Sequence, residues 1–256
     1  MAEHTALFNP HPSITRHGLD NGQTCWVVDD VLLQPERLRQ YAIEQAAQFN
    51  MAPFNAYPGL EFPMPAWVSE QLRDFFNSHI RGFFNARRTL KMNSRMAMVT
   101  LPPEQLQARQ WICHRDSAWV EPAHCIAASV LYLFDNPNLG GTDFYAPTRP
   151  MPEIELFVHD ASTMLNEQFS AKYSIPKNYF QGAPDYFERI GRVPAKFNRM
   201  IFYDGRIFHC GNIHAPESMS PNPVLGRLTL NGFFTCTRKA IVGCAPPNLL
   251  LHKNTH

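Results

Sequence analysis

Four side chains have types and positions that could hold a metal ion. His114 and Asp116 lie two residues apart, so on an extended segment their side chains point to the same side of the backbone. Two imidazoles and one carboxylate, with open positions left over, are a ligand set suited to non-haem Fe(II). His209 follows the apolar run MIFYDGRIF and is the preferred second imidazole, with His214 in the next loop as the alternative.

Further motifs follow the His-x-Asp pair in a fixed order. The sequence YLF (132–134) leads into GGTDF (140–144), the run that contains His209 comes next, and GRLTL (226–230) ends the series. In this order the residues resemble the Fe(II)/2-oxoglutarate-dependent oxygenase superfamily, on its prolyl-4-hydroxylase-like side and nearest to a bacterial subgroup. The resemblance covers roughly residues 94–237.

The resemblance implies roles for five residues. His114, Asp116 and His209 would hold Fe(II), Arg227 would pair with the far carboxylate of 2-oxoglutarate, and Thr229 would add a hydroxyl donor. Without the family, arginine still offers a planar two-donor fork that matches a carboxylate. Arg227 and Thr229 would also share one face of a strand. The separation of 18 residues from His209 to Arg227 is longer than is usual in the superfamily, and a Pro-rich loop takes up the extra length.

Other residues near these motifs are weaker candidates for the walls of a pocket. They are Arg95, Arg115, Ser117, Trp119, Tyr132, Tyr145 and Arg206, with His124 more consistent with a loop histidine. Cys113 and Cys210 flank two of the proposed ligands. Small buried packing residues are the favoured interpretation of these cysteines, over thiolate ligands.

The elements that must position these residues follow from the periodicity of the sequence. Runs of β-branched and aromatic residues between Gly, Pro or Asn predict strands at 94–101, 127–134, 141–147, 198–211 and 226–237. Before them, the pattern predicts a strand at 25–33, a helix at 34–49 and a second helix with Ser69 as its N-cap. The segment between Pro150 and Pro194, which includes PDYFERIG, is more helical in pattern.

The expected fold class is mainly β with flanking helices, arranged as a double-stranded β-helix, or jelly roll. We expect one domain over residues 1–256. Residues 1–93 would form an N-terminal arm and packing helices, and 94–237 the jelly-roll core, interrupted by an insertion at about 150–195.

Composition excludes several classes of protein. The chain of 256 residues has 23 basic and 22 acidic side chains, a net charge of +1, and 45% hydrophobic residues, which argues against disorder and against a nucleic-acid partner. No apolar run is long enough to span a bilayer, and no signal peptide is visible at the N-terminus, so we expect a cytoplasmic protein. The six cysteines form no C-x-x-C pair and would be reduced thiols.

Residues and resemblance together predict a non-haem Fe(II)/2-oxoglutarate-dependent dioxygenase. It would use O₂ to hydroxylate an amino acid, a peptide or another small organic substrate, releasing succinate and CO₂. A cupin-like metal-binding jelly roll that does not use 2-oxoglutarate and a non-enzymatic binding module are the alternatives. The expected partner is a small-molecule or peptide substrate, without nucleic acid or membrane, and the oligomeric state is open, a homodimer included.

Overall fold

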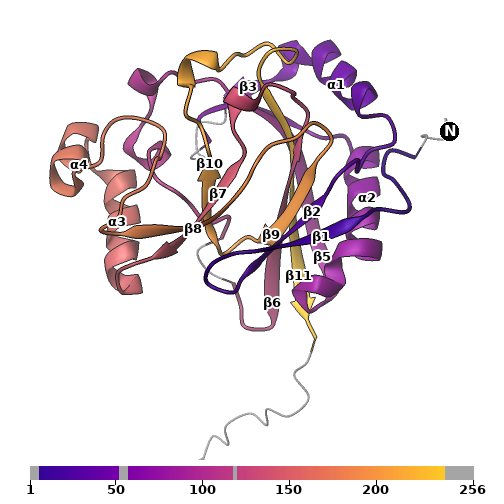
Figure 1. Cartoon of the computed structure of the whole chain (residues 1–256), viewed down its shortest axis with the longest axis horizontal. Coiled ribbons are helices and arrows are strands. Elements are labelled where there is room, and N and C mark those ends of the chain that lie inside the picture. Colours follow the sequence, from indigo (N-terminus) through magenta and orange to yellow (C-terminus); the bar gives the residue numbers. More distant parts are fainter. Residues whose placement is uncertain (1–5, 52–56, 118–119, 240–256) are drawn as a thin grey trace, which may run out of the picture.

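The computed structural model describes residues 6–51, 57–117 and 120–239, and within these ranges two antiparallel sheets dominate (Figure 1). The larger sheet has eight strands in the order β1 (Ile14–Gly18), β2 (Thr24–Val28), β9 (Met200–Asp204), β6 (His124–Tyr132), β11 (Arg227–Arg238), β5 (Ala86–Val99), β4 (Gly59–Pro63) and β3 (Asn50–Met51). The smaller sheet has three described strands in the order β10 (Phe208–Gly211), β7 (Thr142–Pro147) and β8 (Phe187–Val193).

The chain crosses repeatedly between the two sheets. After β5 in the larger sheet, His114 makes an antiparallel bridge to His209 of β10 in the smaller one. The chain then returns to β6, runs through β7 and β8, goes back to β9, crosses to β10 and ends in β11. This alternation is the topology of a double-stranded β-helix, and the predicted fold class is confirmed.

Helices cover the outer sides of both sheets (Figure 1). They are α1 (Pro35–Glu44), α2 (Ala66–Phe75), α3 (Met151–Thr163) and α4 (Asn166–Tyr173). Pro35 occupies the first turn of α1, where the missing N–H costs nothing, as the sequence predicts. Among the described residues, no helix has the length and apolar character needed to cross a membrane.

The predicted start of the second helix is wrong by one turn. Helix α2 begins at Ala66 after Pro65, and Ser69 lies inside the helix instead of capping it. The Ser69 hydroxyl contacts the Ser94 hydroxyl of β5 at 2.8 Å, which links the helix to the sheet. After α2 the chain continues as a π-helix over Phe76–Ile80 and a 3₁₀ turn over Arg81–Phe84.

Two expected segment boundaries also need correction. The stretch 184–191 is not helical, because Phe187 begins β8, whose pairing with β7 satisfies its backbone groups. The inserted helices end with α4 at Tyr173, well before residue 195. The first 93 residues are more than an arm with helices, since β1 to β4 all join the larger sheet.

Strand β11 separates an apolar outer face from a polar inner face. Leu228, Leu230 and Phe234 belong to the core cluster shared with helix α2 and the π-helix, and the rings of Phe234 and Phe76 stack at 3.9 Å between centroids. The alternate residues of β11 point between the sheets, because successive side chains of a strand point to opposite faces. A second apolar cluster joins α3 and α4 to the outer side of the smaller sheet.

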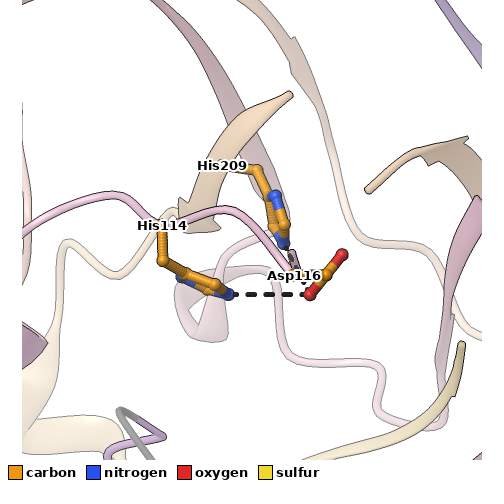
Figure 2. A group of neighbouring side chains, drawn as sticks. All are labelled: His114, Asp116 and His209. Carbon is orange, nitrogen blue, oxygen red and sulfur yellow. Dashed lines mark ion pairs between the residues drawn. The ribbon is translucent and has the colours of Figure 1, made fainter. Parts of the chain in front are cut away.

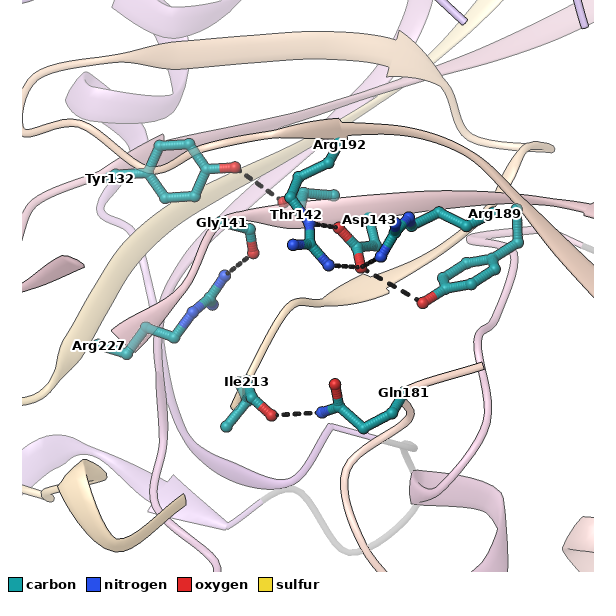
Figure 3. A network of polar contacts seen from close by, with 10 residues as sticks. Tyr132, Gly141, Thr142, Asp143, Gln181, Arg189, Arg192, Ile213 and Arg227 are labelled. Atoms are coloured by element: carbon teal, nitrogen blue, oxygen red, sulfur yellow. Dashed lines mark hydrogen bonds and ion pairs between the residues drawn. The ribbon is translucent and has the colours of Figure 1, made fainter. Parts of the chain in front are cut away.

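A buried ion pair stabilises the smaller sheet (Figure 3). Asp143 of β7 is only 3% exposed and lies opposite Arg192 of β8 in the strand register. Arg192 donates from Nε to Oδ1 at 2.6 Å and from Nη2 to Oδ2 at 2.8 Å. Arg189 Nη1 lies 3.9 Å from Oδ2, and the Tyr145 hydroxyl donates to Oδ2 at 3.4 Å. The carboxylate thus has donors on both oxygens.

We expect Asp143→Asn to lower the free energy of unfolding by about 1.5–3 kcal/mol, the range for hydrogen bonds to charged groups. A loss above this range is not expected, because the Arg192 side chain is 34% exposed and water would partly solvate the unpaired guanidinium. Asp135→Asn is the matched control, since Asp135 is 67% exposed in its pair with Arg39 and should change stability by less than about 1 kcal/mol. Urea titration measures the free energy of unfolding of both variants. Equal losses in the two would contradict the stabilising role of the Asp143–Arg192 pair.

Candidate active site

The backbone holds the three candidate ligands in place. His114 N–H donates to His209 O at 3.0 Å, and His209 N–H donates to His114 O at 2.9 Å. Asp116 N–H donates to Gly205 O at 2.8 Å, in the turn between β9 and β10. Each candidate ligand is therefore tied to an element of the jelly roll, although His114 and His209 are 95 residues apart in the sequence.

The three side chains converge on one point (Figure 2). Their ligand atoms all lie within 4.8 Å of one another. Asp116 Oδ1 is 4.0 Å from His114 Nε2 and 3.7 Å from His209 Nε2. His214 is exposed and does not belong to this group, so the structure brings His209, and not the alternative, to the His-x-Asp pair.

The protonation states suit a cation at this point. His209 Nδ1 lies 2.9 Å from the carbonyl of Ile207, which can only accept, so Nδ1 carries the hydrogen and the Nε2 lone pair faces Asp116. Burial lowers the pKa of His209 to about 4, which keeps the ring neutral. Desolvation, followed by the neighbouring His209, also lowers the pKa of His114 to about 4, although its side chain keeps 49% exposure at the cavity.

The pKa of Asp116 is shifted upward, whereas those of the two histidines are shifted downward. Burial raises the pKa of its carboxyl to about 6, which shows that the protein alone solvates the negative charge poorly. Its Oδ2 atom is buried without a hydrogen-bond partner among the described residues. A cation bound between Asp116 and the two imidazoles would supply the missing compensation, so the residues present fit a divalent metal ion.

We expect Gly205→Ala to weaken metal binding at least tenfold. A methyl group at residue 205 would lie 3.1 Å from Asp116 Oδ2 and 2.9 Å from Ile126 Cγ2, so the carboxylate has to shift from its present position beside the two imidazoles. Gly82→Ala is the control, because nothing lies within 4 Å of its added methyl. Titration with Co(II), followed by its absorption spectrum, measures the affinity. Equal affinities of the two variants would show that the Asp116 position is not critical.

Arg227 lies at the start of β11 and is 5% exposed. Its Nε donates to Leu139 O at 2.9 Å and its Nη2 to Gly141 O at 2.8 Å, so the loop that leads into β7 (139–141, here called the GGTDF loop) holds the guanidinium (Figure 3). A guanidinium has five N–H donors, and these contacts use only two of them in their main bonds. Nη1 has no hydrogen bond to the described part of the chain, and its two hydrogens remain for a ligand.

All five residues singled out in the sequence border one inner recess of about 90 Å³. They are His114, Asp116, His209, Arg227 and Thr229. The Thr229 hydroxyl donates to Ala97 O at 3.3 Å, a long bond from which its single hydrogen could turn toward a ligand carboxylate. Strand alternation places Arg227 and Thr229 on one face of β11, and both border the recess between the sheets.

A wider cavity of about 660 Å³ shares walls with this recess. Three of the weaker candidates line it, namely Arg95, Arg115 and Ser117, and Trp119 lies outside the described residues. The sequence did not indicate the aromatic walls Tyr57, Tyr179, Phe180 and Phe233. Of these, only Phe233 had a usable signal, since it continues the alternation of Arg227 and Thr229 along β11.

The remaining weaker candidates make contacts elsewhere. The contacts are His124 with Glu121, Tyr132 with Thr142, Tyr145 with Asp143 and Arg206 with Asp204. Cys210 borders the cavity and Cys113 is fully buried, but the described metal-ligand group contains no cysteine.

Comparison with known families covers most of the chain. Residues 10–234 match the family model DUF6445, whose description is a family of unknown function. The chain belongs to the DUF6445 family. No curated protein matches its sequence. The candidate site of this DUF6445 protein, from His114 to Thr229, lies entirely inside the matched segment.

Several solved structures are similar to the DUF6445 chain at low sequence identity. HygX from Streptomyces hygroscopicus, with nickel and 2-oxoglutarate bound, has a TM-score of 0.46 at 10% identity, covering 85% of this chain and 84% of its own. The non-haem α-ketoglutarate-dependent epimerase SnoN from nogalamycin biosynthesis has a TM-score of 0.44 at 12% sequence identity. The match covers 89% of this chain and 88% of SnoN. A Pseudomonas putida prolyl-4-hydroxylase has a TM-score of 0.38 at 14% sequence identity. The match covers 90% of this chain and 94% of the prolyl-4-hydroxylase. The double-stranded β-helix of the DUF6445 chain is established by its own strand order.

Proposed function

We propose that the protein is a non-haem Fe(II)- and 2-oxoglutarate-dependent dioxygenase that hydroxylates a small organic molecule or peptide. The convergence of His114, Asp116 and His209 with the buried Arg227 on one recess carries the proposal. A metal-binding jelly roll without a co-substrate would need the three ligands, but would gain nothing from a buried arginine with unused donors beside them.

His114 Nε2, His209 Nε2 and Asp116 Oδ1 would hold the ferrous ion. The bound ion would supply the redox chemistry with O₂ and open positions for the co-substrate. The protein keeps both imidazoles neutral and the lone pair of His209 aimed at the site, through the hydrogen bond to Ile207 O. The strand pairing of His114 with His209 limits relative movement of the ligands.

Arg227 and Thr229 would bind the far carboxylate of 2-oxoglutarate. The two Nη1 hydrogens of Arg227 can donate to it, since Nε and Nη2 already bond to the GGTDF loop. Gly211 leaves space there, because a methyl group at this position would lie 3.5 Å from Arg227 Nη2. The guanidinium is positioned before the ligand arrives, so binding loses little side-chain entropy.

The outer cavity favours a substrate with an acidic group. Arg95, Arg109 and Arg115 line it, and Asp116 is the only carboxylate among its described lining residues. Arg95 already forms an ion pair, since its Nε lies 2.7 Å from Glu61 Oε1. The Arg115 guanidinium lies 4.7 Å from the Phe208 ring centre, and stacking on a ring leaves its in-plane donors able to grip a carboxylate or phosphate. Aromatic walls would contact the rest of the substrate.

The test is consumption of 2-oxoglutarate with Fe(II) and O₂, first without substrate and then with small acids, each paired with its neutral amide. We expect succinate and CO₂ in equal amounts, and stimulation by an acid but not by its amide. Arg115→Gln should raise the Michaelis constant for the acid roughly tenfold or more and leave the Michaelis constant for the co-substrate unchanged. Iron binding without any succinate would favour the metal-binding jelly roll, and no iron binding would favour a non-enzymatic module.

A further inference from the structure

Two cysteines face each other at the end of the larger sheet that lies far from Arg227. Cys125 is the second residue of β6 and Cys236 the third from the end of β11, and the strand register pairs them directly. Residues opposite one another on antiparallel strands have Cα atoms about 4.5–5.5 Å apart. Disulfides join residues whose Cα atoms are about 4.4–6.8 Å apart, so directly paired positions on these two strands lie in the range for a bridge.

The two sulfurs already interact. The Cys125 thiol donates to the Cys236 sulfur, and this hydrogen bond is the main cause that lowers the pKa of Cys236 to about 7 and raises that of Cys125. The Thr89 hydroxyl donates to Asn77 Oδ1 at 2.7 Å, so its contact with the Cys236 sulfur at 3.6 Å positions this side chain without donating a hydrogen to it. Burial alone acts the other way, and at Cys25 it raises the pKa of the thiol far above its usual value. The contact between the two thiols therefore favours loss of the proton from Cys236 over loss of the proton from Cys125.

Access to the pair requires only local opening. Both residues are buried, with 3% and 0% exposure, but they lie within three residues of the ends of their strands. A register shift between Thr235 and Cys236 also interrupts the pairing of β11 with β5 at this point. Strand ends with irregular pairing open at low free-energy cost, and hydrogen peroxide is hardly larger than water.

We propose that Cys125 and Cys236 form a peroxide-reactive dithiol that closes to a disulfide between β6 and β11. The Cys236 sulfur attacks one oxygen of hydrogen peroxide, the O–O bond breaks, and a sulfenic acid and one water result. The Cys125 sulfur then attacks the Cys236 sulfur, the S–S bond forms, and the sulfenic oxygen leaves as a second water. Two thiols lose two electrons and two protons, and peroxide is reduced to two waters.

The role of each cysteine follows from the direction of the hydrogen bond. We assign the attack to Cys236, the acceptor whose pKa the contact lowers, and the resolving role to Cys125, the donor. This chemistry is separate from the candidate metal site, whose flanking cysteines are Cys113 and Cys210. These two also lie opposite each other, next to the bridge of His114 with His209, and they provide an internal comparison.

The test uses the full-length protein, reduced, desalted and kept free of metal, then treated with hydrogen peroxide and alkylated. Peptide mapping by mass spectrometry without reduction should find Cys125 joined to Cys236, and dithiothreitol should release it. In Cys125→Ser, Cys236 should stop at the sulfenic acid, which dimedone traps. In Cys236→Ser, Cys125 should remain alkylatable. Cys25→Ser is the control and should keep the crosslink.

Three results would overturn the proposal. The first is full alkylation of both residues after peroxide treatment, in protein whose near-ultraviolet circular dichroism shows that it is folded. The second is a bridge between Cys113 and Cys210, or one to Cys244, in place of the proposed pair. The third is dimedone labelling of Cys125, and not Cys236, in the single variants, which would reverse the assigned roles.

Discussion

His209→Ala is expected to abolish ferrous iron binding and, with it, 2-oxoglutarate turnover. His209 is 5% exposed, its Nε2 lies 3.7 Å from Asp116 Oδ1, and its orientation depends on the hydrogen bond to Ile207 O. Removing it leaves two ligands, one of which, His114, is half exposed. We expect the affinity for Fe(II) or Co(II) to fall at least about 100-fold, or about 2.8 kcal/mol at 1.4 kcal/mol for each factor of ten.

His214→Ala is the matched control for this experiment. His214 lies five residues further on, is exposed, and lies outside the group of converging ligand atoms. It should leave metal affinity and turnover within twofold of the unchanged protein. Metal titration by calorimetry separates binding from activity, so it also tests the site if no substrate is known. If His214→Ala and not His209→Ala lost the metal, the assignment of the distal histidine would be wrong.

Arg227→Ala is expected to raise the Michaelis constant for 2-oxoglutarate on the order of 100-fold, about 2.8 kcal/mol, while metal affinity stays within threefold. The change removes the buried guanidinium whose Nη1 hydrogens would bind the far carboxylate. Stability should also fall, by about 2–3 kcal/mol, because the carbonyls of Leu139 and Gly141 lose their donors inside the protein.

Arg227→Lys separates the two effects. A lysine keeps the charge but cannot reach two carbonyls and a carboxylate at once, so we expect a smaller loss of stability and an intermediate Michaelis constant. Arg206→Ala is the control, since Arg206 pairs with Asp204 on the surface at 2.5 Å. Binding of 2-oxoglutarate to the metal-loaded protein, measured by calorimetry, should follow the same order. An unchanged Michaelis constant in Arg227→Ala would favour a site that does not use 2-oxoglutarate.

Local patterns in the sequence predicted features that depend only on residues close together in the chain. The two-residue spacing of His114 and Asp116 and of Arg227 and Thr229 was enough to predict shared faces, because strand geometry has a period of two. The first turn of α1 followed from Pro35 in the same way. Ser69 was misplaced because its hydroxyl bonds to β5, a contact that no local rule contains.

Long-range pairing was beyond the reach of these rules. The stretch that begins β8 at Phe187 has a helical pattern of apolar residues, and only its register with β7 makes it a strand. The same register joins Asp143 to Arg192 across 49 residues of sequence. The walls Tyr57 and Tyr179 come from segments outside the motif region or inside the insertion, so nothing local marks them.

Residue types and their spacing along the chain were enough to identify the groups that could do chemistry and their order: His114 and Asp116 together, one later histidine, and Arg227 with Thr229. The fold was needed to show that His209 and not His214 meets the pair, because the bridge between His114 and His209 brings that histidine beside it. It also decided that Arg227 is held by the GGTDF loop. Residues far apart in sequence approach through strand register, and register is a property of the whole sheet.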